Sequence, residues 1–144
     1  MTAPSLPPLT VLPVTAAYDY AYFRDLLADP SVLATGVAVR IARVPLLAVP
    51  VGGPRRGGYF PVPNVTVGLA VRGLLAHRPG FPAPRLRWAP YRDTCHVVEW
   101  GDVPPVDDDA ARGRFYGYRE TAIAAFLSSP VSAAPSASPV RSRR

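Results

Sequence analysis

The chain has 144 residues, 49% of them hydrophobic, and is long enough to bury a core without a disulfide or a metal ion to hold it together. Its formal net charge is +6, with 16 arginines and no lysine, but the arginines are scattered, which argues against a strong nucleic-acid footprint. A single cysteine excludes an intrachain disulfide, and no apolar run approaches the ~20 residues that a membrane-spanning helix requires.

Composition divides the chain into three parts. Residues 1–14 are rich in proline and are predicted to be extended. Residues 129–144 form a tail of Ser, Ala, Pro and Arg that has too few bulky apolar side chains to fold, so we predict that it is disordered. A single folded domain is therefore expected over residues 15–128.

Helical periodicity predicts three helices in this domain, at about residues 16–28, 65–77 and 109–127. Apolar side chains recur there at the spacing of one helix face. The predicted core stripes are Tyr20, Phe23 and Leu27 (widened by Tyr22 and Leu26) in the first helix, Val67, Ala70, Val71, Leu74 and Leu75 in the second, and Phe115, Tyr118, Ala122 and Phe126 in the third. Asn64 is placed to cap the second helix.

Five strands are predicted between the helices, at about residues 36–43, 46–51, 59–62, 85–88 and 95–100. The element order is then α-β-β-β-α-β-β-α. Because consecutive strands are joined by short connections, the sheet should be mainly antiparallel. We predict an α+β fold, a single domain in which three helices pack on one four- to five-stranded sheet. Pro50 and Pro61 cannot donate ladder hydrogen bonds, so their strands should be edge strands or bulged.

The last two strands have a predicted register. If they pair as a hairpin with Arg85 opposite Glu99, then Leu86 lies opposite Val98 and both face the core. Trp88 and Trp100 share that core face, and Trp88 lies opposite His96. Arg85, Arg87, Cys95 and Glu99 share the other face, where Arg85 and Glu99 can form a cross-strand ion pair.

The segment VGGPRRGGYF, which begins at Val51, could be an anion-binding loop or a tight turn. A phosphate-binding loop normally leads into a helix and carries a lysine, whereas this segment leads into a strand and the chain has no lysine. The glycine and proline pattern therefore favours a tight turn between strands. Arg55 and Arg56 are predicted to be exposed at its tip, where a guanidinium could bind a carboxylate or a phosphate.

Three sequence blocks, DYAYFRDLLADPSVL, LLAVPVGGPRRGGYFPVP and CHVVEWG, resemble those of a small uncharacterised family of actinobacterial, streptomycete-type proteins, a domain of unknown function. The resemblance covers about residues 16–101. It implies a cytoplasmic protein of a bacterium with a GC-rich genome, and it brings no catalytic or binding residues with it. The N-terminal segment also lacks the basic start of a signal peptide, which favours the cytoplasm.

The candidate catalytic residues have simpler interpretations. Cys95 and His96 are adjacent in a predicted strand, so their side chains point to opposite faces and cannot form a dyad. One cysteine and two histidines are too few for a typical zinc site. The acidic run at residues 107–109 is typical of a helix start. We therefore predict no catalytic residue, no metal and no cofactor, and an enzyme that uses Cys95 or His96 remains an alternative.

Arginine and aromatic side chains are what protein interfaces favour. We interpret the chain as a small non-enzymatic binding protein that presents its arginine-containing glycine loop to a protein or an anionic partner, with no membrane contact. The candidate contact residues are Arg55, Arg56, Tyr59, Tyr91 and Arg92. A nucleic-acid or nucleotide-binding protein is the second hypothesis, because single-stranded nucleic acids also stack on aromatic side chains.

Overall fold

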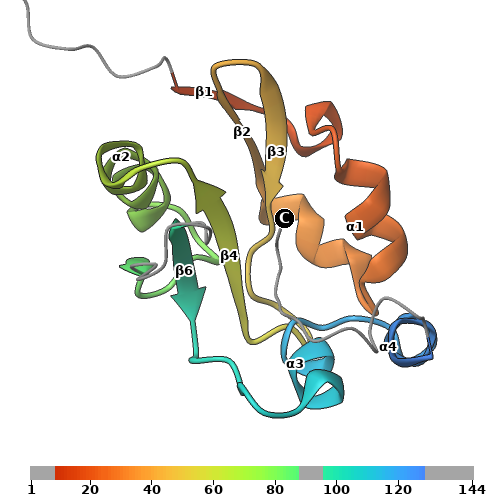
Figure 1. The fold of residues 1–144 in the computed structure, drawn as a ribbon. Coiled ribbons are helices and arrows are strands. Elements are labelled where there is room, and N and C mark those ends of the chain that lie inside the picture. Colours follow the sequence, from red (N-terminus) through yellow and green to blue (C-terminus); the bar gives the residue numbers. More distant parts are fainter. Residues whose placement is uncertain (1–8, 88–95, 129–144) are drawn as a thin grey trace, which may run out of the picture.

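The structure, a computed structural model, describes residues 9–87 and 96–128 (Figure 1). Helices and strands are interspersed along the chain, and the α+β class expected from the sequence is confirmed. The elements are β1 (Leu9–Leu12), the short 3-10 helix η1 (Val14–Ala16), α1 (Tyr20–Leu26), the 3-10 helix η2 (Pro30–Thr35), β2 (Val37–Ile41), β3 (Val44–Ala48), β4 (Gly57–Val62), α2 (Val65–Ala76), β5 (Arg85–Arg87), β6 (His96–Gly101), α3 (Asp109–Phe115) and α4 (Glu120–Leu127).

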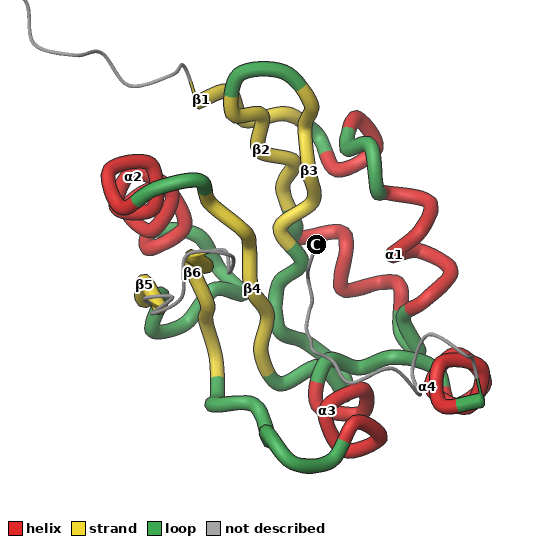
Figure 2. Tube along the Cα trace, in the orientation of Figure 1, coloured by secondary structure: helices red, strands yellow, loops and turns green. Residues whose placement is uncertain are grey.

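The strands form two antiparallel sheets instead of the single sheet that we predicted. Sheet 1 has the order β1-β2-β3 and sheet 2 has the order β4-β6-β5. The two separate because the chain runs as a loop from β3 to β4, past α3 (Figure 2), instead of turning back to pair with β3. Sheet 1 also gains β1, which pairs with β2 from Leu9 opposite Ile41 to Leu12 opposite Ala38. This strand lies in a segment for which we expected only extended chain.

The predicted hairpin register is confirmed. Arg85 lies opposite Glu99 and Leu86 lies opposite Val98 in the β5–β6 ladder. Val98 is fully buried, and the Arg85–Glu99 ion pair forms at 3.0 Å between Nη2 and Oε2. The alternation of apolar and charged residues therefore determined which face of sheet 2 points inward.

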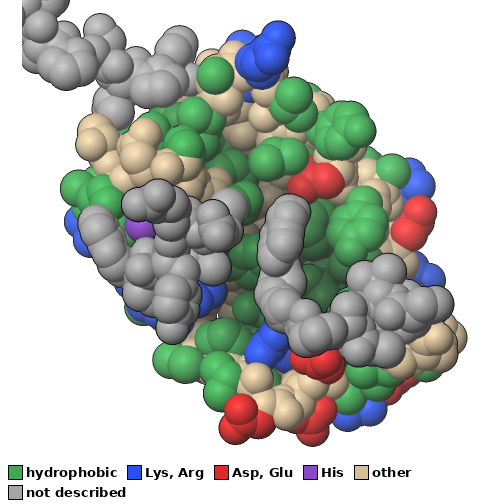
Figure 3. All heavy atoms as spheres, viewed as in Figure 1, with side chains coloured by type: hydrophobic (Ala, Val, Ile, Leu, Met, Phe, Trp, Pro, Cys, Tyr) green, Lys and Arg blue, Asp and Glu red, His purple; other side chains and the backbone are tan. Residues whose placement is uncertain are grey.

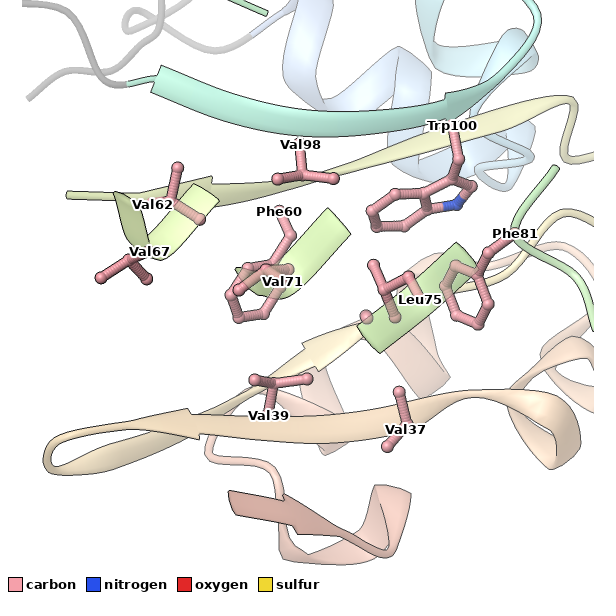
Figure 4. Packing of buried hydrophobic residues seen from close by; sticks show 11 residues of the cluster. Val37, Val39, Phe60, Val62, Val67, Val71, Leu75, Phe81, Val98 and Trp100 are labelled. Atoms are coloured by element: carbon pink, nitrogen blue, oxygen red, sulfur yellow. The ribbon is translucent and has the colours of Figure 1, made fainter. Parts of the chain in front are cut away.

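Sheet 1 is buried on both faces. Val37 and Val39 of β2 point toward sheet 2 and α2 (Figure 4), whereas Ala38 points to the opposite side, toward α1 and η2. The first core cluster consists of Val37, Val39, Ala48, Phe60, Val62, Val67, Val71, Leu75, Phe81, Val98 and Trp100. The second consists of Ala17, Leu27, Val32, Leu33, Ala38, Leu47 and Val49. The molecule is thus layered about sheet 1, with helices beyond it on one side and sheet 2 on the other.

Helix α2 follows the prediction, and its neighbour β4 has the expected position. The side chain of Asn64 caps α2 by accepting a hydrogen bond from the backbone N–H of Val67 at 2.9 Å. Pro61 lies in β4, which is an edge strand of sheet 2, as its missing N–H requires. Pro50 lies just beyond β3 and is buried.

The first helix is shorter than predicted. Asp19 precedes it, but the Asp19 carboxylate accepts a hydrogen bond from the backbone N–H of Leu47 at 2.8 Å instead of capping the helix. Leu27 is buried as expected, although it already has an extended backbone. Tyr22 is 63% exposed, so its predicted place in the core is wrong. The tie from Asp19 to β3 fixes where this helix begins and which face it buries.

The predicted third helix is two helices. Gly117, with φ of +77°, ends α3 and turns the chain, a conformation that favours glycine. The connection is bound to the end of α1, because the N–H of Ala28 donates to Gly117 and the N–H of Arg119 donates to Leu26, both at 2.8 Å. The break changes which side faces inward in α4, so that Phe126 is 51% exposed and its predicted burial is wrong.

Several predicted features lie outside the described residues. These are the tail at 129–144, Trp88, Tyr91, Arg92 and Cys95. Within the described ranges, none of the helices has the length and apolar character needed to cross a lipid bilayer.

Two glycines test the packing. Gly101 has φ of +81° and a Cβ there would press on the backbone oxygen of Arg56, whereas a Cβ at Gly73 in α2 would meet nothing within 4 Å. Gly101→Ala should therefore lower the free energy of unfolding by about 2 kcal/mol or more. Gly73→Ala should raise it by about 0.5–1 kcal/mol through helix propensity. Urea denaturation of both variants checks this, and equal effects would contradict the packing at Gly101.

Candidate functional site

The glycine-rich segment forms the predicted tight turn. Gly52 and Arg55 pair across it, since the N–H of Gly52 donates to the oxygen of Arg55 at 3.0 Å and the reverse bond is 2.9 Å long. Gly53, with φ of +52°, and Pro54 form its tip. The turn connects strands of different sheets, however, so it is not the tip of a hairpin.

The two arginines after this tip point in opposite directions. Arg56 is exposed as predicted, but Arg55 is only 4% exposed, so its predicted exposure is wrong. The Nη1 of Arg55 donates to the backbone oxygen of Tyr116 at 2.8 Å, and Nε donates to that of Val49 at 3.4 Å. Its guanidinium also lies 5.5 Å from the centroid of the Tyr116 ring, with the Tyr118 side chain nearby. Arg55 therefore ties the turn to the end of β3 and to the α3–α4 connection.

This buried cation has no acidic partner within 4 Å in the part of the chain that the structure describes. Burial is the largest influence on Arg55 and lowers its pKa, while the nearby Tyr118 and Tyr116 oppose that shift. The charge is compensated by carbonyl dipoles and an aromatic face instead of a carboxylate.

The glycines that follow the arginines allow close packing. A Cβ at Gly57 would lie 2.7 Å from the Phe115 ring, and one at Gly58 would lie 2.6 Å from Nε1 of Trp100 and 2.7 Å from Nη2 of Arg55. Their role here is to let Phe115, Trp100 and the buried guanidinium approach the backbone. The glycine content of the segment thus has a structural explanation that requires no anion.

An exposed surface forms on the outer side of sheet 2. Tyr59 of β4 is 45% exposed, and its ring packs edge-on against Tyr116 at 5.5 Å. Tyr116 contacts Phe115 in turn, with 5.1 Å between ring centroids. We call the following residues the arginine–tyrosine face: Arg56, Tyr59, Arg87, Arg114, Phe115 and Tyr116.

The arginines of this face are paired with acids. Arg56 contacts Asp102 at 2.8 Å, and Arg114 contacts Glu120 at 2.9 Å. Arg87 binds Glu99 at 2.7 Å. The same carboxylate also forms an ion pair with Arg85. Glu99 lies opposite Tyr59 in the β4–β6 ladder. In Figure 3, acidic and basic side chains are mixed over α3 and α4 at the lower edge of the view. The face thus carries both positive and negative charges, with aromatic side chains beside the ion pairs.

The sequence analysis identified only part of this face. Arg56 and Tyr59 were among the predicted contact residues, whereas Arg87, Arg114 and Tyr116 were not. Tyr116 was missed because a continuous helix was expected, although the glycine of the FYGY sequence was a usable stop signal. The predicted contacts Tyr91 and Arg92 lie outside the described residues.

Of the alternative catalytic residues, only His96 lies within the described residues. His96 is partly buried at the start of β6, and Cys95 lies outside the described residues. No group of three or more His, Cys, Asp or Glu side chains that could hold a metal ion occurs within residues 9–87 and 96–128.

The buried tyrosines should make the fold sensitive to alkali. Burial, followed by the nearby Tyr59 and Glu99, raises the pKa of Tyr116 from 10.0 to about 12. Burial also raises the pKa of Tyr118. Because the unfolded chain loses these protons first, their contribution to stability is complete below pH 10 and is lost as the pH rises through 12. Denaturation at pH 9 to 12 should show this loss, and Tyr116→Phe should reduce it; an unchanged pH dependence would contradict the assignment.

The adjacent arginines should differ strongly in their effect on stability. Arg55→Met leaves the Tyr116 oxygen without its donor and should lower the free energy of unfolding by about 2–3 kcal/mol. Arg56→Met removes only an exposed ion pair and should change it by less than about 1 kcal/mol. Urea denaturation of the two variants measures the difference. Equal and small effects would mean that Arg55 is not the buried tie described above.

Comparison with known proteins gives a family without an assigned activity. No curated protein and no solved structure matches the chain. A model described as a family of unknown function, DUF6302, matches residues 11–144, which is most of the sequence. The chain therefore belongs to the DUF6302 family of unknown function.

Proposed function

We propose that this chain is a small binding protein that recognises a protein partner through the arginine–tyrosine face. One observation carries the proposal: Tyr59 is half-exposed and is held edge-on against Tyr116, which itself lies over the buried guanidinium of Arg55. An aromatic side chain fixed in this way loses little freedom when a partner covers it. Tyrosine and arginine are also the side chains that contribute most at protein interfaces.

A binding role fits this chemistry better than catalysis does. With a pKa raised to about 12, Tyr116 is protonated at neutral pH and would be a poor general base. The arginines of the face are well suited to recognition, because each planar guanidinium can bind a carboxylate through two hydrogen bonds. The acids paired with Arg56 and Arg114, Asp102 and Glu120, are exposed. Exposed pairs are worth about 0–1 kcal/mol, so a partner could displace these two at little cost.

A protein partner is favoured over a nucleic acid. Arginine and tyrosine would also suit stacked bases. However, Glu99, Asp102 and Glu120 lie among the arginines and would repel a continuous phosphate backbone. We further propose that the protein acts in the cytoplasm of a bacterium with a GC-rich genome of the actinobacterial type, since the single cysteine suits a reducing compartment and arginine replaces lysine throughout.

Tyr59→Ala tests the proposal, with Tyr18→Ala as the matched control. Tyr18 is 82% exposed and lies before α1, outside the arginine–tyrosine face. The tagged protein would be purified from its host, and the partners that it retains would be quantified by mass spectrometry. Loss of a central aromatic contact costs about 2 kcal/mol, so Tyr59→Ala should reduce recovery of the specific partner by about 30-fold. The control should leave it unchanged.

Two results would contradict the proposal. Recovery of the same partners by Tyr59→Ala at the wild-type level would mean that the face is not the contact surface. Salt-sensitive binding of short DNA or RNA that depends on Tyr59 would support the nucleic-acid hypothesis in its place.

A further inference from the structure

A shallow hollow adjoins the arginine–tyrosine face beside Phe115. Its lining combines two arginines with three apolar side chains and comes from the β3–β4 connection, the β6–α3 connection and α3. The lining residues are Arg56, Pro105, Ala111, Arg114 and Phe115. The two arginine side chains are 66% and 57% exposed. The hollow therefore offers an apolar surface beside two accessible positive charges.

The base of the hollow is held in place by contacts below and beside it. Phe115 is 8% exposed and packs against Gly57, while the backbone N–H of Arg56 donates to the Phe115 oxygen at 2.8 Å. Arg112 fixes the β6–α3 connection by donating to the oxygens of Pro105 at 3.0 Å and Val106 at 2.8 Å. A ligand would therefore meet a preformed surface and would not have to order it.

The two arginines also retain donors. Arg56 uses Nε and Nη2 on the same oxygen of Asp102, at 3.0 and 2.8 Å. Arg114 uses Nε and Nη2 on Glu120, at 2.9 and 3.1 Å. A guanidinium has five N–H donors, so in each case the Nη1 group can donate to a second carboxylate without loss of the first.

Resting on the proposed function, we propose that this hollow is the subsite for an acidic side chain of the partner, with an apolar side chain of the same peptide against Phe115 and Pro105. The partner segment is thus a peptide that alternates acidic and apolar residues. An acidic side chain brings one negative charge to the Nη1 donors of this rim, whereas a polyphosphate would bring several against Asp102 and Glu120. The apolar lining gives a hydrocarbon side chain a surface that a nucleic-acid backbone would not use.

The test uses fluorescence anisotropy with a dye-labelled peptide of alternating glutamate and leucine and the full chain. The probe would be compared with the same peptide carrying glutamine for glutamate and with a short single-stranded oligonucleotide. The variant is Arg56→Gln with Arg114→Gln. The matched control, Arg43→Gln with Arg72→Gln, removes the same charge from exposed arginines of the β2–β3 turn and α2.

We expect the glutamate peptide to bind wild type at least about tenfold more tightly than the glutamine peptide, a difference of about 1.4 kcal/mol. The double variant should lose that preference, and the control should retain it within about twofold. Arg56→Lys with Arg114→Lys keeps the charge but removes the planar guanidinium groups. A partial loss of the preference for the glutamate peptide in this variant shows that the protein still folds and that the guanidinium geometry contributes to binding.

Three results would overturn the inference: equal binding of the two peptides by wild type, unchanged binding by the double variant, or tighter binding of the oligonucleotide. The recovery of the cellular partner by Tyr59→Ala tests the face as a whole separately from each of these results. If the double variant binds the peptide as tightly as wild type does while recovery of the cellular partner still requires Tyr59, the subsite is wrong and the binding face stands. If recovery is independent of Tyr59, the proposed function itself fails.

Discussion

The structure depends on one buried charge. The guanidinium of Arg55 joins its own turn to the nearby end of β3 at Val49 and to the α3–α4 connection at Tyr116, which is 61 residues away in the sequence. Removing a guanidinium from water costs several kcal/mol, and only well-placed acceptors can offset that. Two carbonyl oxygens, a phenol and an aromatic ring supply that compensation here. The positions of the two sheets and of α3 at this corner follow from the geometry that the guanidinium requires.

The exposed face is a consequence of the same geometry. Because the Tyr116 ring lies over Arg55, it comes within reach of Tyr59 on the outer side of sheet 2. Gly57 and Gly58 bring Phe115 and Trp100 against the β4 backbone, which places the neighbouring Arg56 at the surface. The turn therefore sends one arginine into the interior and the next to the solvent.

The sequence predicted local features well and distant ones poorly. The β5–β6 register and α2 were predictable because alternation, an opposite-charge pair and an Asn64 cap all act over a few residues. The break at Gly117 is accompanied by hydrogen bonds between the end of α1 and residues about ninety positions later, and the separation into two sheets depends on the path of the loop from β3 to β4. No local pattern encodes either feature. Arg55 and Arg56 are identical neighbours, so their different burial could not be inferred from either side chain.

With the proposed function, stability and recognition fall to different arginines of one dipeptide. Arg55 is buried, and every group that it contacts belongs to the framework, so a change there alters the whole corner of the molecule. Arg56, by contrast, pairs at the surface with Asp102, and changes there alter the charge that a partner meets while the core contacts remain. Surface charge can therefore vary on this scaffold at little cost in stability. The proposed interface could therefore change its specificity while the Tyr116 ring that packs against Tyr59 stays the same.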